Sequence, residues 1–340
     1  MDDGTDNSFV FVLPDPGDVI SGGHLYNQRI TQALRGKGCR VERIELPQAG
    51  GRMASSASRY VFDSLYLDPK SLVELSRLPL ENSASIFLAH HLHSLFPPDG
   101  RAAEAVFAEH EWPQLRRFSH CWATSPFMAE YLIANGVESR RVVTVEPALE
   151  EVQPGRLELQ DPPRVLVVAN LIARKGVLEF LSCLASKSEL PTFELRILGG
   201  DLEPDYARSC RELAADNPAL ASRVVFAGTR LPDEMPAEYR SGDLFVSVAV
   251  VETFGMASQE AMAHGLPLLL REGGYSGRHL AGRGAGEVHA TVEELVVSML
   301  GLLNKTERLV ALKRAAHAAR PAGRTWTDAA VSLLEQLSID

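Results

Sequence analysis

The sequence predicts an α/β protein of two domains, each with a parallel sheet covered by helices. In both halves, short apolar runs rich in β-branched residues alternate with amphipathic stretches of helical period. The length of 340 residues suits two ordinary domains better than a single core. Between 146 and 163 the composition changes to Glu, Pro, Gly and Gln without a periodic apolar face. We therefore expect an N-terminal domain over 1–150, a linker over 151–163, a C-terminal domain over 164–320 and a C-terminal helix within 321–340.

Each domain has its own series of expected elements. In the first half, strands are expected at 9–13, 41–46, 85–89, 121–124 and 142–145. Helices are expected after Ser21-Gly22-Gly23, near 72–78, over 101–118 with an interruption at Trp112-Pro113, and after the capping residue Ser125. The segment 47–58, small and polar around Gly50-Gly51, is expected to be a loop.

In the second half, strands are expected at 165–168, 193–198, 244–248 and 266–270, with another strand and its turn within 224–230. Amphipathic helices are expected at 292–303, 307–319 and 326–337. The order of strands and helices again favours a parallel sheet.

The stretch 243–267 combines a buried strand, a turn and a helix with two acids at one end. Glu252 lies on the turn and Glu260 on the early helix, with seven residues between them. Carboxylates accept hydrogen bonds, so their natural ligands are hydroxyl groups, while the backbone amides of 254–256 at the helix start suit an anion. Glu252 alone would be expected only to complement the helix dipole. The pair instead indicates a ligand with two polyol parts around an anion, as in a nucleotide sugar.

A second candidate site lies after the strand at 165–168, where Arg174 and Lys175 precede a helix. Two adjacent cations at a strand end suit a diphosphate, because Arg offers a forked set of donors and Lys a compact charge. The alternative is a solvated basic corner. Because the two acids are assigned to hydroxyls, the anion needs a cationic partner, which favours the functional interpretation.

Composition and charge exclude several classes of protein. The formal net charge of -10 argues against a nucleic acid partner. The four cysteines are far apart in the sequence and show no C-x-x-C pattern, which is typical of reduced residues in a cytoplasmic protein. The first residues lack the pattern of a signal peptide, and no run of 18 apolar residues follows. We therefore expect a cytoplasmic protein without stable membrane insertion.

The segment from Glu252 through Glu260 to the A-M-A-H-G-L-P run resembles the E-x7-E signature of the retaining glycosyltransferases of the GT-B fold, family 4. The resemblance implies two Rossmann-like domains that face each other across a cleft, with the C-terminal helix returning to the first domain. It implies that Glu252 contacts the transferred sugar and Glu260 the ribose hydroxyls. Arg174 and Lys175 resemble the family's R-K-G element, whose side chains bind the donor phosphates.

Further positions are assigned through the same resemblance. Gly22 and Gly23 match the glycine-containing first loop that approaches the diphosphate, and Thr229 and Arg230 follow an F-x-G that lies beside the base. A histidine at the end of the strand at 85–89 is expected to contact the sugar, with His91 or His93 ahead of His90; a metal site there is disfavoured because no carboxylate or Cys completes a ligand set. The candidate donor-binding residues are Gly22, Gly23, Arg174, Lys175, Thr229, Arg230, Thr253, Phe254, Gly255, Met256 and Glu260, and the catalytic candidates are Glu252, Arg174, Lys175, His91 and His93.

The sequence thus predicts a retaining glycosyltransferase that uses a nucleotide-sugar donor without a metal. A UDP-sugar is expected as donor, with GDP- and ADP-sugars as alternatives, and the acceptor is expected to be a small molecule or glycan. A GT-B epimerase or a pseudo-glycosyltransferase would share the same motifs. A subunit that binds a nucleotide sugar without turnover is disfavoured, because both acids and both cations are present.

Overall fold

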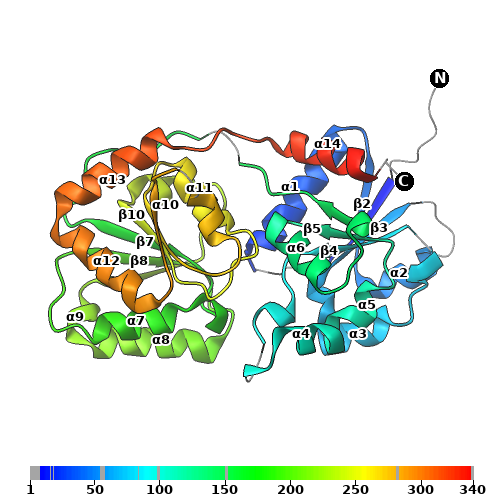
Figure 1. Ribbon diagram of the computed structural model, residues 1–340, viewed down its shortest axis with the longest axis horizontal. Coiled ribbons are helices and arrows are strands. Elements are labelled where there is room, and N and C mark those ends of the chain that lie inside the picture. The colour runs from blue at the N-terminus through cyan, green and yellow to red at the C-terminus, as the bar shows by residue number, and fades with distance from the viewer. Residues whose placement is uncertain are drawn as a thin grey trace. The chain divides into compact units, whose positions relative to one another are not determined.

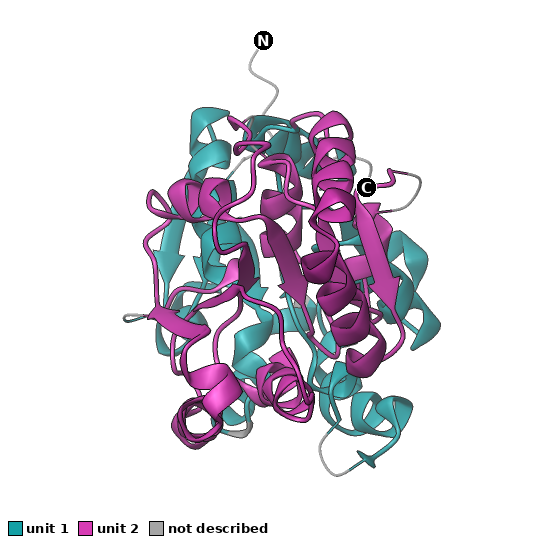
Figure 2. Cartoon of the chain, turned by 90° about the vertical axis from the view of Figure 1, so that its left-hand side faces the viewer, with its two compact units in different colours: residues 1–18, 23–148, 324–340 teal, residues 19–22, 149–323 magenta. Residues whose placement is uncertain are grey.

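The computed structural model describes residues 8–15, 17, 19–53, 58–82, 84–97, 100–149, 152–280 and 283–337. The chain forms two compact units, shown in different colours in Figure 2. The first unit comprises Met1–Asp18, Gly23–Ala148 and Arg324–Asp340. The second comprises Val19–Gly22 and Leu149–Gly323. A short piece of the loop before the first helix is therefore part of the second unit.

The first unit is a parallel sheet of six strands in the order β2-β1-β3-β4-β5-β6. The strands are β1 (Ser8–Val12), β2 (Arg40–Ile44), β3 (Arg59–Asp63), β4 (Ser85–Ala89), β5 (His120–Ala123) and β6 (Val142–Thr144). The helices are α1 (Gly22–Gly36), α2 (Leu46–Met53), α3 (Pro69–Leu75), α4 (Ala103–Val106), α5 (Trp112–Leu115), α6 (Pro126–Ala134) and α14 (Trp326–Leu337).

The second unit is also a parallel six-stranded sheet, in the order β12-β11-β10-β7-β8-β9. Its strands are β7 (Arg164–Val168), β8 (Glu194–Leu198), β9 (Val224–Gly228), β10 (Leu244–Ser247), β11 (Leu268–Arg271) and β12 (Gly286–His289). Its helices are α7 (Val177–Ala185), α8 (Pro204–Asp216), α9 (Pro218–Ala221), α10 (Met235–Ser241), α11 (Met256–Ala263), α12 (Val292–Asn304) and α13 (Thr306–Ala318).

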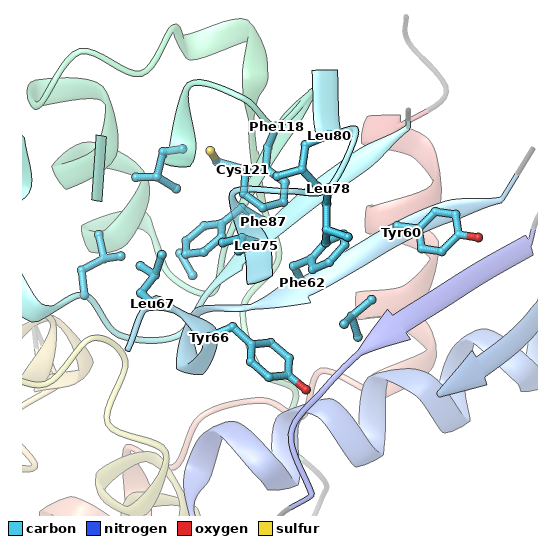
Figure 3. Packing of buried hydrophobic residues seen from close by; sticks show 14 of the residues in the cluster. Tyr60, Phe62, Tyr66, Leu67, Leu75, Leu78, Leu80, Phe87, Phe118 and Cys121 are labelled. Atoms are coloured by element: carbon cyan, nitrogen blue, oxygen red, sulfur yellow. The ribbon is translucent and has the colours of Figure 1, made fainter. Parts of the chain in front are cut away.

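The core of the first unit is rich in aromatic side chains. Phe118 contacts Phe62 of β3 and Phe87 of β4, with ring centroids 5.5 and 5.4 Å apart (Figure 3). On β5, Trp122 packs edge-on against Tyr26 of α1 and donates a hydrogen bond of 3.0 Å to its hydroxyl oxygen. Tyr26 also contacts Trp326 of α14. These contacts fix α1 and the C-terminal helix on the sheet. The Gln336 side-chain amide also donates a hydrogen bond to the Thr144 carbonyl and accepts one from the Thr144 amide.

The central strands of the second sheet are buried on both faces. Alternate side chains of β7 point to opposite sides, so Val165 and Val167 pack with residues of α7, α8 and α12, while Leu166 packs with residues of α10 and α11. In Figure 1, α7 and α8 lie on one side of this sheet and α10 and α11 on the other. This double burial explains the continuous apolar runs of these strands.

Most expected elements occur within a few residues of their predicted positions, and Ser125 accepts a hydrogen bond from the Met128 amide as a cap should. The prediction of a loop over 47–58 was wrong, because α2 occupies Leu46–Met53. Leu46, Ala49 and Met53 share one buried face of this helix, and their apolar contacts outweigh the low helix propensity of Gly50-Gly51. Residues 54–57 of that segment lie outside the described residues.

Other departures from the prediction concern missed or irregular elements. The sequence analysis missed β3, which pairs with β1 and β4, and β12 at the edge of the second sheet. The expected interruption at Trp112-Pro113 is preceded by a π-helical turn, Phe107–Glu111, before α5. None of the described helices is both long enough and apolar enough to cross a lipid bilayer.

A buried ion pair joins α13 to the start of β10. The Lys313 ammonium donates to Asp243 Oδ1 at 2.6 Å and to the Gly242 carbonyl at 3.2 Å, and both charged side chains are almost completely buried. Asp243 Oδ2 in turn accepts the amides of Gln160 and Arg164. The pair therefore connects α13, the start of β10 and the segment that leads into β7.

We expect Lys313→Met to lower the free energy of unfolding by about 3–5 kcal/mol, because it leaves the Asp243 carboxylate buried without a counter-charge. Urea denaturation measures the loss. The matched control is Arg208→Met, which removes one partner of the exposed Arg208–Asp205 pair and should change stability by less than about 0.5 kcal/mol. Equal effects of the two substitutions would contradict the role given to Lys313.

Candidate functional site

The order of strands in the second unit identifies the carboxyl ends of two central strands as a candidate ligand site. From β7 the chain continues to β8 and β9 on one side, whereas β10, β11 and β12 lie on the other. In open parallel sheets, ligands bind at the carboxyl ends of the two strands where the order reverses. Here these strands are β7 and β10, which are direct neighbours. The loop after β7 carries Arg174 and Lys175, and the loop after β10 carries Glu252.

The two loops are joined by side chains and backbone. The Lys175 ammonium forms an ion pair with Glu252 Oε1. The Val250 amide donates to the Arg174 carbonyl at 3.0 Å. Gly176, with φ of +69°, lies so close to β10 that a Cβ there would be 2.4 Å from the Val248 carbonyl oxygen. The structure therefore brings together the predicted cation and acid, which are 77 positions apart in the sequence.

The charges at this site act on one another in a largely buried setting. Burial lowers the pKa of Lys175, the Glu252 carboxylate acts to raise it, and the neighbouring Arg174 guanidinium lowers it further. The side chains of Lys175 and Glu252 are only 16% and 15% exposed. Two cations face one carboxylate, so the three groups have an excess of one positive charge, which favours an anionic ligand.

Backbone contacts hold Glu252 in place. Its amide donates to the Gly273 carbonyl at 3.3 Å, and its carbonyl accepts the Tyr275 amide at 2.7 Å. Gly274 between them has φ of +66°, and a Cβ on it would lie 2.2 Å from the Glu252 carbonyl oxygen. The glycine turn after β11 therefore sets the position of the acid by close approach, which only a residue without a side chain permits.

Three aromatic rings support the turn before α11. Phe254 stacks on Tyr275, with centroids 5.4 Å apart, and His279 meets both rings edge-on. His279 Nε2 donates to the Phe254 carbonyl at 2.5 Å, and burial lowers the pKa of this histidine. Gly255 then takes a left-handed φ of +84° and α11 begins at Met256. This fixed start of a helix is suited to an anion.

The second acid, Glu260, lies one turn into α11. Its Oε2 accepts a hydrogen bond of 2.8 Å from the hydroxyl of Tyr239, a fully buried residue of α10. Glu252 and Glu260 thus have different partners, an ammonium for the first and a phenol for the second.

Thr229 and Arg230 follow β9. A Cβ on Gly200 would lie 3.0 Å from Thr229 Oγ1, so this side chain lies beside the glycine turn that follows β8. The Arg230 guanidinium donates to Glu238 Oε1 at 2.9 Å and to the Ala227 carbonyl at 2.6 Å. The Arg230 side chain is thus engaged within the second unit.

The two predicted glycines differ in their surroundings. A Cβ on Gly22 would lie 3.4 Å from Met256 Sδ, so Gly22 is beside the start of α11, and both residues belong to the second unit. The Asn170 side chain supports this arrangement, because it donates to the Ile20 carbonyl at 2.9 Å and accepts the Gly200 amide at 2.8 Å. Gly23 lies in the first unit beside His90, and a Cβ on Gly23 would lie 3.4 Å from the His90 ring.

The three histidines after β4 have unequal environments. His90 Nε2 lies 2.9 Å from Asn27 Oδ1, and the Asn27 amide donates to Asp63 Oδ2 at 2.6 Å. Burial lowers the pKa of His90, while Asp63 acts to raise it. His91 is half-buried and His93 is exposed. The His90 ring is thus engaged within the first unit, and the expectation that His91 or His93 contacts the sugar stays a prediction.

Several residues of the site were missed by sequence reasoning. Tyr239 and His279 contact Glu260 and the Phe254 carbonyl and lie on segments without a recognised motif, whereas Tyr275 ends the glycine turn at 271–275 that the sequence shows after the strand at 266–270. Only Tyr275 and His279 carried a signal, since two aromatic side chains four residues apart follow the glycine turn. Within the residues that the structure describes, there is no group of three or more His, Cys, Asp or Glu suited to a metal ion.

The fold defines the class of protein to which the chain is similar. Two parallel six-stranded α/β units form the GT-B fold of solved glycosyltransferases, which confirms the predicted fold class. The structure of Anabaena HepE in complex with UDP and glucose superposes with a TM-score of 0.70 at 17% identity, covering 97% of this chain and 99% of that one.

Sequence comparison adds a family match for the second unit. Residues 162–305 match the family described as Glycosyl transferases group 1. Sulfoquinovosyl transferase of Arabidopsis thaliana is 33% identical over 120 residues, covering 35% of this chain and 22% of the relative. D-inositol 3-phosphate glycosyltransferase of Rhodococcus jostii is 29% identical over 219 residues, covering 59% and 48%. The matched region thus spans about half or less of these relatives.

We expect Gly274→Ala to lower the free energy of unfolding by at least about 1–2 kcal/mol, because the new Cβ meets the Glu252 carbonyl in a left-handed conformation. Thermal or urea denaturation measures the change. Gly277→Ala is the matched control, since a Cβ there would be 3.6 Å from Val288, an ordinary contact. A Gly274→Ala protein as stable as the control would contradict the proposed constraint.

The buried histidines predict a dependence of stability on pH. Burial lowers the pKa of both His264 and His279 below the ordinary value of 6.5. The unfolded chain therefore binds more protons near and below pH 6.5, and the free energy of unfolding should fall as the pH decreases from 7.5 to 5.5. Urea titrations over this range measure the slope, and His279→Gln should make it shallower. Stability that rises toward pH 5.5 would be the contrary result.

Proposed function

We propose that this protein is a retaining glycosyltransferase of family 4 that transfers a sugar from a nucleotide-sugar donor to an acceptor hydroxyl. The observation that supports the proposal most strongly is the pairing of Lys175 with Glu252 beside the start of α11, at the point where the strand order of the second unit reverses. The match to Glycosyl transferases group 1 covers all of these residues.

In the proposed reaction, the acceptor oxygen forms a bond to the anomeric carbon on the face from which the nucleotide departs. The bond between that carbon and the diphosphate oxygen breaks, and its electron pair stays on the leaving phosphate. The proton of the acceptor hydroxyl passes to that phosphate oxygen. Glu252 binds the transferred sugar, and Lys175 and Arg174 bind the diphosphate.

Positive charge at the leaving group is the main requirement of this mechanism. Charge that develops on the diphosphate is stabilised by preorganised donors and cations. Lys175, Arg174 and the amides at the start of α11 supply them from the two loops that the ion pair joins. The Lys175 ammonium is already held in place by Glu252, so little reorganisation is needed when a donor enters. We propose that the transfer needs no metal.

Glu260 is proposed to bind the ribose hydroxyls and the segment at Thr229 and Arg230 to lie beside the base. UDP is the first nucleotide to test, because the structure of HepE, with the same fold, contains UDP. GDP- and ADP-sugars are the alternatives. The acceptor is proposed to be a small molecule or glycan, bound by the first unit, where one histidine of the group His90, His91 and His93 contacts the sugar; His91 and His93 stay ahead of His90, whose ring is already engaged by Asn27.

A GT-B epimerase or pseudo-glycosyltransferase would use the same donor groups, and the identity of the products distinguishes these enzymes from a glycosyltransferase. A binding subunit without turnover would keep Lys175 and Glu252 for affinity alone. Slow hydrolysis of a donor that is abolished by Glu252→Ala or Lys175→Ala would exclude the binding subunit.

We expect Glu260→Gln and Glu252→Gln to affect different steps. Glu260→Gln should raise KM for the donor and reduce the thermal shift produced by millimolar UDP, because it weakens a hydrogen-bond acceptor for the ribose. Glu252→Gln should mainly lower kcat, by about 10²-fold or more, because it acts on the reacting sugar. Steady-state kinetics of donor hydrolysis and differential scanning fluorimetry measure the two effects.

The control for this comparison is Arg208→Met, on the outer helix α8. This variant should leave kcat, KM for the donor and the thermal shift produced by UDP unchanged. Hydrolysis should persist in excess EDTA. Equal changes of kcat and KM in both glutamate variants would refute the division of roles. If no nucleotide or nucleotide sugar shifted the melting temperature at millimolar concentration, the proposed activity itself would fall.

A further inference from the structure

A buried phenol lies directly behind the proposed ribose-binding acid. Tyr239 belongs to α10, which connects β9 to β10, and its side chain is 1% exposed. Its hydroxyl donates to Glu260 Oε2 at 2.8 Å across 21 positions of sequence. Neither the family motif nor the proposed reaction assigns a role to this residue.

The ring of Tyr239 is held on two sides. It stacks on the imidazole of His264, with centroids 5.3 Å apart and planes 18° apart, and packs against Phe245 of β10 at 6.5 Å. His264 is itself fixed, because its Nδ1 donates to the Gln153 carbonyl at 2.9 Å and its carbonyl accepts the Gly155 amide at 2.8 Å. The position of the phenol oxygen is therefore determined by the core and by the segment that enters the second unit.

The helix that carries Tyr239 is anchored as well. The preceding residue, Glu238, accepts two hydrogen bonds from Arg196 of β8 and one from Arg230. Consecutive residues of α10 thus contact two residues of the proposed donor site, Arg230 and Glu260. Because α10 is connected to both β8 and the start of α11, it has little freedom to move when a ligand binds.

We propose that Tyr239 is a positioning residue that orients the Glu260 carboxylate toward the ribose hydroxyls of the donor. The inference rests on the proposed function, and it adds the residue that sets the geometry of this contact. A glutamate side chain has three rotatable bonds, so a fixed donor on one oxygen restricts the plane of the carboxylate. A carboxylate has about four acceptor positions, so a bond to the phenol is compatible with further bonds to sugar hydroxyls.

Two physical effects maintain this arrangement. Burial, together with the Glu260 charge, raises the pKa of Tyr239 well above its ordinary value, so the phenol remains a donor throughout the working range of pH. In addition, a carboxylate that turned away would leave a buried hydroxyl without an acceptor, which is unfavourable. Glu260 therefore meets an incoming ribose in a preset orientation, and less order has to be created on binding.

The test compares UDP with 2′,3′-dideoxy-UDP, which lacks the ribose hydroxyls, by isothermal titration calorimetry. The ratio of their dissociation constants reports the contribution of those hydroxyls. Tyr239→Phe keeps the ring and its stack on His264 but removes the hydroxyl. We expect this variant to weaken the binding of UDP by about tenfold, the factor associated with one hydrogen bond to a charged group. The dissociation constant of the dideoxy analogue should stay unchanged, so the preference for UDP over the analogue should fall.

Tyr206→Phe is the matched control. Tyr206 is a half-buried tyrosine of the second unit, and its hydroxyl accepts a hydrogen bond of 2.8 Å from the Leu178 amide, with no contact to Glu260 in that bond. This variant should lower the melting temperature but keep the ratio of the wild type. Glu260→Gln should reduce the ratio, and adding Tyr239→Phe to it should have little further effect, because the two residues act through one carboxylate.

The outcomes separate the inference from the proposed function. A wild-type protein that binds UDP and discriminates against the dideoxy analogue, together with an unchanged ratio in Tyr239→Phe, overturns the role of Tyr239 alone. Equal weakening of both ligands in Tyr239→Phe, or the same loss of discrimination in Tyr206→Phe, shows a merely structural effect and also overturns it. Failure of the wild type to bind UDP overturns the proposed donor and this inference with it.

Discussion

The ion pair between Lys175 and Glu252 is the interaction on which the rest of the candidate site depends. It joins the loops that leave β7 and β10, the two strands from which the chain departs in opposite directions. A cation and an acid in a largely buried setting are stable only when their backbones are held at the right separation. The surrounding structure supplies this through close backbone approaches at Gly176 and Gly274 and through a hydrogen bond between Val250 and Arg174. The site thus lies at the carboxyl ends of two central strands, on loops that backbone contacts hold in place.

The two acids are held by different sets of contacts. Glu252 is positioned by the glycine turn after β11 and neutralised by an ammonium, whereas Glu260 is positioned by a phenol whose ring is part of the core. The rings of Phe254, Tyr275 and His279 hold the turn between them. Each functional group is therefore supported by packing that extends into the hydrophobic interior, so core stability and site geometry are coupled.

Local sequence signals predicted much of the fold, because buried parallel strands are continuous apolar runs and capping residues mark helix starts. They failed at α2, where two glycines concealed an apolar face formed by Leu46, Ala49 and Met53, and at β3, whose short run was not recognised between polar segments. The candidate cations and acids belong to short motifs, and the structure brings Lys175 and Glu252 of these motifs together. The residues that support them were not found from the sequence, since Tyr239 and His279 act through contacts 21 and 25 positions away, and only the folded chain shows which partners meet. The roles of the individual residues stay predictions.

The buried pair of Lys313 and Asp243 has a consequence for where the second unit ends. The family match stops at residue 305, within the loop between α12 and α13, yet the ammonium that neutralises Asp243 comes from α13. A fragment with the bounds of the match would expose the apolar face that Ala316 covers and would leave a carboxylate at the root of β10 without its counter-charge. The end of the family match is therefore not the end of the second unit. In this chain, the second unit extends through α13, beyond the residues that the family match covers.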